Sequence, residues 1–570
     1  MKSEKIRHFL FGEYPLKKAV PFLVTKIILL LCGTYLSLVF NMQSAVFFVQ
    51  AFNKNFSLAF ACLIAFVFIV FAGLIILLFR FGFIEKLHEQ ILRFPRLAQI
   101  LLLLFAALCA GTYIAQFYSS AHVSLAQLNS VSSWWFHIPS ALGFGTPLGF
   151  TPPRWILSLI LFIPLTVFYA YFTSAFSDII KSVLTTLTKT ERNFLVFASV
   201  TVVIYILFLY NSTSVYYGGL DRIYSYDSLP GSDYLINPFY YWSYYQYPLE
   251  PNFSLPIMVL AQSLTPSVAL WGIIMRSVIQ FILLFICLVM LSRMISENPR
   301  VRLLTLLIFS FSFPVLILAT ITERRVITFI FLIFAVYRST LRTKDENYWL
   351  SVASGAVICN AYVSLLSIKS AKTFIKDLFC FGSTFLFIAA FLGKISGLVD
   401  LRTQVNNFAN NGWMDAAVDF KTKLIHYMNF VSSSFFTPLS ESSGTSWSMA
   451  QNNGGYTVFF VTGIIIALLS VAGFILNFRK RFARIAFTGI LVSFFFVFVK
   501  TLNMSENAVV LNTLFFAWAF VSLCIMAIDR IIPGRKIKTC VLIIIAAACF
   551  AVNIYAAYRL LDFGMAVYPV

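Results

Sequence analysis

The run VALWGIIMRSVIQFILLFICLVML, residues 268–291, decides the fold class of this chain. Arg276 is the only charged residue among these 24. A helix of about 20 apolar residues crosses the ~30 Å hydrocarbon core of a bilayer, so the run predicts a membrane-spanning helix. Because a charge in mid-span is costly in lipid, we expect Arg276 to face protein, water or an acidic partner.

The composition of the whole chain agrees with a membrane protein. Of 570 residues, 60% are hydrophobic and only 11% are charged, with a mean hydropathy of +0.86. Soluble domains carry about 25% charged residues, so a chain of several soluble domains is excluded. We predict an all-α polytopic transmembrane helix bundle with about 13 spans. Besides the run above, the spans lie near 21–40, 57–79, 97–117, 155–175, 193–211, 303–320, 324–338, 378–397, 457–476, 483–500, 507–528 and 538–558.

The positions of the basic residues predict the orientation. Of the 42 Lys and Arg, 29 fall in alternate connections that share a side with the N-terminus. Basic residues accumulate in cytoplasmic loops, so we expect a multi-pass cell-membrane protein with a cytoplasmic N-terminus. The net charge of +20 then mostly reflects topology. It indicates contact with membrane lipids and gives no reason to expect nucleic acid.

Residues 349–367 are long enough for one crossing, but that crossing would invert every later basic loop. It would place Lys369, Lys372 and Lys376 outside. We therefore expect this stretch to form a re-entrant hairpin that turns near Asn360. Non-helical backbone at that depth is tolerated only where it is buried in protein or lines a cavity.

The predicted organisation has three regions. Residues 1–190 form an N-terminal four-span part of unknown role. Residues 191–530 form the core, with two long outer loops, 211–253 and 398–456, that carry short helices. Residues 531–570 hold the last span and an outer C-terminus.

The first outer loop carries the chemistry that is hardest to explain as packing. It holds ten of the 26 tyrosines, which suit either sugar stacking or an aromatic belt at the membrane interface. Asp221 and Asp227 follow the flexible Gly218-Gly219 pair. Each carboxylate is either a general base towards a substrate hydroxyl or a turn residue paired with an arginine such as Arg222.

Other predicted outer segments add ionisable groups. The turn that contains Glu323, Arg324 and Arg325 places two guanidinium groups outside, where they suit a phosphate ligand or anionic headgroups equally. Glu506 caps the following helix or reaches the site. His426, with Asp415 and Asp419, falls on an amphipathic stretch that lies on the membrane surface, and residues 437–455 are polar enough to act as a gate.

Four stretches together resemble the membrane glycosyltransferases of the GT-C superfamily. They are GGLDRIYSYDS (218–228), YYQYPLEPNFSLP (244–256), ITERRVITFIFLIFAVYRS (321–339) and NMSENAVVLNTLFFAWAF (503–520). The resemblance covers residues 190–530. The first outer loop has no clean DD, DE or ED pair after the span, as some subfamilies have there, which leaves the subfamily open.

The resemblance implies transfer of a sugar from a polyprenyl-phosphate donor to a glycan or lipid acceptor on the outer face. Asp221, with Asp227 second, takes the position of the catalytic base. Arg222, Arg324 and Arg325 would hold the donor phosphate. Tyr224, Tyr226, Glu323, His426 and Glu506 are candidate substrate-binding residues. A divalent metal is needed in some members, and no other cofactor is implied.

Two other functions fit the same sequence features. A polysaccharide polymerase or ligase also uses outer loops and arginines, but transfers a glycan chain rather than a single sugar. A flippase or transporter would move a lipid-linked glycan without breaking bonds. It would be expected to place its charges along a central cavity, where Arg276 is the only candidate.

Overall fold

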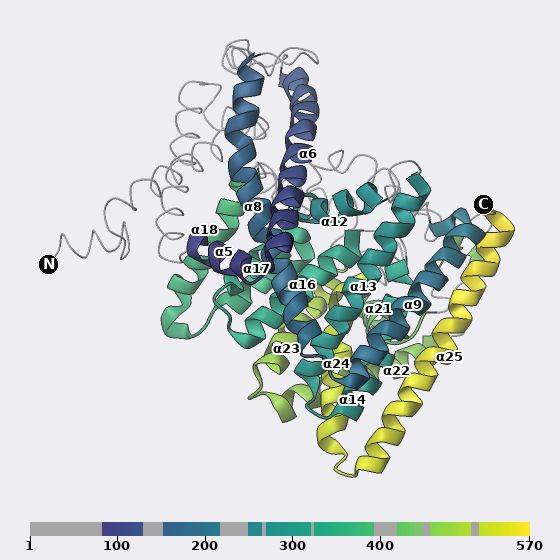
Figure 1. Ribbon diagram of the computed structural model, residues 1–570. Helices are drawn as coiled ribbons and strands as arrows, with labels where there is room; N and C mark the ends of the chain where they lie inside the picture. The colour runs from purple at the N-terminus through teal and green to yellow at the C-terminus, as the bar shows by residue number, and fades with distance from the viewer. Residues whose placement is uncertain are drawn as a thin grey trace.

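The computed structural model describes ten stretches of the chain: residues 83–128, 152–216, 249–264, 269–320, 324–392, 419–438, 441–443, 446–448, 456–502 and 512–570. The predicted spans 21–40 and 57–79 lie outside these residues. Figure 1 shows the described helices packed into one bundle, with α6 and α8 side by side and α25 along one edge.

Almost all regular structure is helical. The α-helices are α5 Phe83–Leu92, α6 Arg96–Leu128, α8 Pro152–Thr185, α9 Lys189–Ser212, α12 Glu250–Leu264, α13 Ala269–Ile295, α14 Pro299–Ser310, α15 Phe313–Leu316, α16 Arg324–Leu341, α17 Glu346–Ala356, α18 Phe374–Phe391, α21 Phe420–Ser432, α22 Tyr456–Asn477, α23 Arg481–Ser493, α24 Thr513–Ile531 and α25 Arg535–Val567. The 3₁₀ segments are η1 Ser214–Tyr216, η2 Leu318–Thr320, η3 Ile358–Ser367 and η4 Ala371–Thr373, and η5 Phe494–Val499 is a π-helix. Strands β1 Glu441–Ser443 and β2 Ser446–Ser448 form one antiparallel pair.

Seven of the described helices are long and apolar enough to cross a membrane, or eight if one bent pair counts as a span. The bent pair is α14 with residues 313–320, at an angle of 55°. It occupies the predicted span 303–320, so that span is a broken helix rather than a straight one. The all-α, membrane-type character is confirmed, whereas the total of 13 spans stays a prediction.

The outer helices present apolar side chains to their surroundings. On α9, Phe197, Ile204 and Phe208 are 73%, 63% and 54% exposed, while Leu195 and Ile206 on the opposite face are buried. A soluble helix would turn polar residues outward, so this pattern is typical of a helix that faces lipid. The central helices differ: 83% of the apolar window of α24 and 72% of that of α13 are buried inside the bundle.

Glycine permits the close approach of α22 to its neighbours. A Cβ atom on Gly473 would overlap the carbonyl group of Leu523 in α24, and one on Gly463 would overlap the carbonyl group of Met428 in α21. Small residues at such crossings let two backbones meet, which is the main source of packing energy between helices in a membrane.

A single buried amide joins two breaks in the helical structure. Nδ2 of Asn553, on α25, donates to the carbonyl oxygens of Phe311 at 2.6 Å and Phe435 at 2.7 Å. Its Oδ1 accepts from the backbone N–H of Thr437 at 2.6 Å and from the Thr437 hydroxyl at 2.7 Å. All four hydrogen-bonding positions of the amide are therefore used. They satisfy backbone groups that the end of α14 and the end of α21 leave without helical partners.

The stretch predicted to be a hairpin breaks into two short helices and returns to its starting level. Helix α17 ends at Ala356 and η3 begins at Ile358. Nη2 of Arg481 donates to Oε1 of Glu346, at the start of α17, at 2.8 Å, and to the carbonyl oxygen of Leu366, near the end of η3, at 3.4 Å. One guanidinium group therefore touches both ends of the segment, so the two ends lie together, as a hairpin requires; the re-entrant position in the membrane stays a prediction.

Ion pairs join several connections that are predicted to be cytoplasmic. Six ion pairs join described side chains: Arg93–Asp178, Arg293–Glu191, Arg302–Glu191, Arg338–Asp345, Arg481–Glu346 and Lys538–Asp529. Four of them link two different connections and so hold those two on the same side, whereas Arg338–Asp345 and Lys538–Asp529 each lie within one connection. The alternation that the basic residues predicted is thus reproduced in space for these segments.

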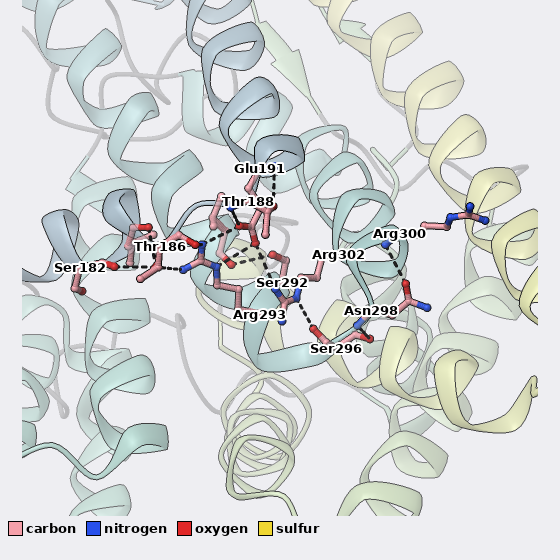
Figure 2. A network of polar contacts seen from close by, with 12 residues as sticks. Ser182, Thr186, Thr188, Glu191, Ser292, Arg293, Ser296, Asn298, Arg300 and Arg302 are labelled. Carbon is pink, nitrogen blue, oxygen red and sulfur yellow. Dashed lines mark hydrogen bonds and ion pairs between the residues drawn. The ribbon is translucent and has the colours of Figure 1, made fainter.

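Glu191 is the centre of the largest of these polar clusters, drawn in Figure 2. Its carboxylate accepts from Nη2 of Arg293 at 2.8 Å and Nε at 3.0 Å, and from the backbone N–H of Thr188 at 2.9 Å. Thr188 and Glu191 together form a capping box at the start of α9. The cluster ties the connection between α8 and α9 to the end of α13.

Replacing Asn553 with Leu should lower the free energy of unfolding by about 2 kcal/mol or more, because two carbonyl groups and one backbone N–H lose their partner in a buried place. Thermal unfolding of the purified protein in detergent measures this. The control is Val552→Ala, a neighbouring residue that is 40% exposed. Equal effects of the two substitutions would contradict the role assigned to the amide.

Gly473→Ala should destabilise the fold by about 2 kcal/mol, because the added methyl group overlaps the Leu523 carbonyl and forces α22 away from α24. The matched control is Gly382→Ala on α18, where a Cβ atom would meet nothing within 4 Å. That variant should be neutral or slightly stabilising, since Ala favours a helix over Gly. The same thermal measurement compares the two, and a loss as large in the control would count against close helix contact.

Candidate functional site

Most residues of the site predicted from the sequence lie outside the described residues. Asp221, Arg222, Tyr224, Tyr226 and Asp227 fall in residues 217–248. Glu323 and Glu506 fall in two further stretches of this kind, and Arg324 opens α16, though its side chain is not described. The structure does describe the helices that lead into these segments.

The hydroxyl group of Tyr210 joins the elements from which these segments start. It donates to the carbonyl oxygen of Thr320 at 2.9 Å and lies 3.2 Å from Oγ of Ser277, and all three residues are buried. Tyr210 lies near the end of α9, eleven residues before Asp221, and Thr320 precedes Arg324 by four. The segment that leads to the predicted base and the turn with the two arginines therefore start from one junction.

The same junction lies next to the buried arginine of α13. Arg276, the neighbour of Ser277, is 0% exposed, and Gln280 one turn further is 1% exposed. The expectation that Arg276 faces the protein interior rather than lipid is confirmed. A guanidinium group held in a low-dielectric interior acts strongly on any nearby anion. The interior of the bundle thus holds a fixed positive charge beside the junction.

Arg325 is placed in the first turn of α16. Its side chain is half-buried, and its carbonyl oxygen accepts a hydrogen bond from the Thr328 hydroxyl at 2.8 Å. The backbone N–H groups of the first turn point away from the helix and attract negative charge, an effect that a neighbouring arginine reinforces. This end of α16 is suited to an anionic ligand such as a phosphate.

His426 belongs to a helix that only partly matches its prediction. Helix α21 begins after Asp419, whose carboxylate accepts from the backbone N–H of Thr422 at 3.2 Å. Hydrogen bonds from Thr422 hold the pKa of Asp419 below its usual range. The stretch was expected to lie on the membrane surface, but residues 427–432 are buried, because they pack against α22 and α24. His426 is half-buried at the change between the two halves.

Hydropathy does not reveal the residues that organise this region. Tyr210 and Asn553 look like ordinary residues of apolar spans, since their partners lie between 67 and 242 positions away. In the sequence, the signal for such a residue is a polar side chain inside an apolar span, and the prediction from it concerned Arg276 alone. Among the described residues, no group of three His, Cys, Asp or Glu side chains is arranged to hold a metal ion.

Comparison with known proteins adds no relative: no family model, no curated protein and no solved structure matches this chain. Its function has to be argued from its own residues.

Tyr210→Phe should lower the free energy of unfolding by about 1 kcal/mol, because Thr320 and Ser277 lose a buried hydrogen-bond partner. Tyr205→Phe is the control, since Tyr205 lies on the same helix and makes no side-chain hydrogen bond among the described residues. Thermal unfolding measures stability, and limited proteolysis of the intact protein reports on segments 217–248 and 321–323. If Tyr205→Phe loses as much stability as Tyr210→Phe, the junction does not hold these elements together.

Proposed function

We propose that the chain is a membrane glycosyltransferase that moves a sugar from a polyprenyl-phosphate donor to a glycan or lipid acceptor on the outer face of the cell membrane. The N-terminus is cytoplasmic in this proposal. The observation that supports it is the Tyr210 junction, because it joins the end of α9, which precedes the acidic, tyrosine-rich loop, to Thr320, four residues before Arg324.

In the proposed reaction, the carboxylate of Asp221 accepts the proton of the acceptor hydroxyl. The hydroxyl oxygen attacks the anomeric carbon, and the bond from that carbon to the phosphate oxygen breaks. The leaving polyprenyl phosphate gains charge at the headgroup level, where Arg222, Arg324 and Arg325 stabilise it. Asp227 is the second candidate for the base. Tyr224, Tyr226, Glu323, His426 and Glu506 align the sugar and the acceptor.

A second candidate function is favoured by a different observation. The start of α12 and the last turn of α17 meet inside the bundle, where the backbone N–H of Leu249 donates to the carbonyl oxygen of Gly355. Discontinuous helices that meet near the midplane are a feature of transporters. A flippase or transporter of lipid-linked glycan would leave the bond between sugar and phosphate intact. A polysaccharide polymerase or ligase would leave a single-sugar donor untouched.

Asp221→Asn should abolish release of polyprenyl phosphate from a polyprenyl-phosphate monosaccharide, because the amide cannot accept the proton. The purified protein is incubated with donor and acceptor, and free carrier is measured, together with thermal stability to show that the fold is kept. Asp233→Asn, in the same loop, is the control and should retain activity. Full activity of Asp221→Asn would remove Asp221 from the proposal. No carrier release by the natural protein, with binding of the donor intact, would favour the transporter.

Removing both charges of Arg324 and Arg325 by substitution with Gln should raise the donor concentration needed for half-maximal rate by about tenfold or more, as expected when charge-assisted hydrogen bonds to a phosphate are lost. Arg479→Gln with Lys480→Gln removes the same charge from exposed positions at the opposite end. That control should leave the donor dependence unchanged. If the first pair behaves like the second, the outer arginines contact lipid headgroups instead.

A further inference from the structure

The start of α12 meets the last turn of α17. The backbone N–H of Leu249, directly before α12, donates to the carbonyl oxygen of Gly355, in the last turn of α17, at 2.7 Å. A Cβ atom on Gly355 would overlap the Leu249 side chain, so only glycine permits this approach. Figure 1 shows α12 and α17 on the side of the bundle where α8 lies. We name this contact the α12–α17 junction.

The junction lies deep in the bundle. Gly355 is nine residues along α17 from Glu346, whose carboxylate pairs with Arg481 at the charged end. At 1.5 Å per residue the junction is about 14 Å from that end. The hydrocarbon core of a bilayer is about 30 Å thick, which places the junction near half depth.

Three polar side chains at the junction have no hydrogen-bond partner in the part of the chain that the structure describes. Asn252 and Asn360 are each 0% exposed, and neither the oxygen nor the nitrogen of either side-chain amide has a hydrogen-bond partner among the described residues. The Ser354 hydroxyl group is 8% exposed and likewise has no hydrogen-bond partner among the described residues. Asn252 lies one turn beyond Leu249, and Ser354 directly precedes Gly355. Asn360 lies one 3₁₀ turn after Val357, and its backbone N–H donates to the Val357 carbonyl oxygen at 2.9 Å.

The unsatisfied polar groups at the junction indicate that a ligand binds there. A buried amide left without hydrogen bonds costs about 1–3 kcal/mol, and native structures almost always satisfy such groups with protein or ordered water. Here five polar atoms on three side chains have no partner among the described residues, and all three side chains lie within five residues of the Leu249–Gly355 contact. By contrast, Asn553, buried to the same degree, has all four of its positions filled by protein.

We propose that the α12–α17 junction is a hydrated internal binding site for an uncharged, hydroxyl-bearing ligand. Amide and hydroxyl groups both donate and accept, as the hydroxyl groups of water or a sugar do. The three side chains carry no charge, and the buried carboxylate of Glu250, directly after Leu249, would repel an anion. An uncharged hydroxylated molecule meets neither obstacle. Leu249 and Asn252 lie at the end of the predicted outer loop 211–253. None of the residues assigned to the transfer reaction belongs to the site, so it does not rest on that reaction.

Labelling of cysteines in the full-length purified protein tests the site. Ser354→Cys exchanges one oxygen for sulfur, and the probe is 2-hydroxyethyl methanethiosulfonate, itself an uncharged hydroxylated solute. Mass spectrometry reads every cysteine in the same molecule. Cys287 and Cys524 are buried in α13 and α24, and Cys540 is exposed, so the chain supplies its own controls.

Cys at position 354 should react at least about tenfold faster than Cys287 and Cys524, because the reagent reaches only thiols in contact with water. Continued protection of Cys287 shows that the fold is kept. Reaction at position 354 no faster than at Cys287, while Cys540 reacts, would overturn the proposal. Asn360→Cys is the second variant and is judged by the same ratio.

A stability measurement gives an independent answer in a chain with all its natural cysteines. Asn252→Leu replaces an amide by an apolar side chain of similar size. In a dry interior the Asn252→Leu substitution raises the thermal unfolding temperature, because it removes an unsatisfied buried amide. Ser522→Ala on α24 is the control and should raise the temperature, since the buried Ser522 hydroxyl also lacks a partner among the described residues. At a hydrated site Asn252→Leu lowers the temperature. A rise for Asn252→Leu equal to that for Ser522→Ala would contradict the proposal.

Discussion

The structure depends on one constraint: in a bundle surrounded by hydrocarbon, every buried backbone N–H and C=O group needs a partner inside the protein. Unbroken helices meet this requirement by themselves. The described part of the chain contains several breaks, and side chains meet the requirement there. Asn553 serves the ends of α14 and α21, Arg481 serves the end of η3, and Tyr210 serves the end of η2.

Charge is segregated for a related reason. Ion pairs between described side chains gather around the connections at one end, where water and headgroups reduce the cost of ionisation. In these pairs Glu191 and Glu346 are each held by arginine from a distant part of the chain, so the pairs also fasten one connection to another. Arg276 differs from these ion-paired residues in place, because it is fully buried inside the bundle, in the first third of α13. A charged residue inside a membrane-spanning helix is a candidate functional residue.

Two places in the protein therefore have polar groups that packing alone does not explain. One is the region around the Tyr210 junction, with Arg276 beside it and the acidic, tyrosine-rich loop and the arginine turn leading away from it. The other is the α12–α17 junction, with its unsatisfied amides at half depth. The first suits chemistry at the level of the headgroups, and the second suits a neutral ligand inside the bundle. They involve different residues, so each can be tested without the other.

Hydropathy and charge determined by themselves that this is a helical chain of membrane type and that Arg276 avoids lipid. They also predicted a hairpin at residues 349–367, whose two ends lie together at Arg481. These properties depend on local composition and on the energy of placing charge in hydrocarbon, and both can be read along the chain. Only the tertiary structure decided where α14 bends, that the second half of α21 is buried, and which atoms Asn553, Tyr210 and Arg481 bind. Those contacts join residues between 67 and 242 positions apart. A polar residue in an apolar run shows that it needs a partner, but packing in three dimensions selects which partner it finds.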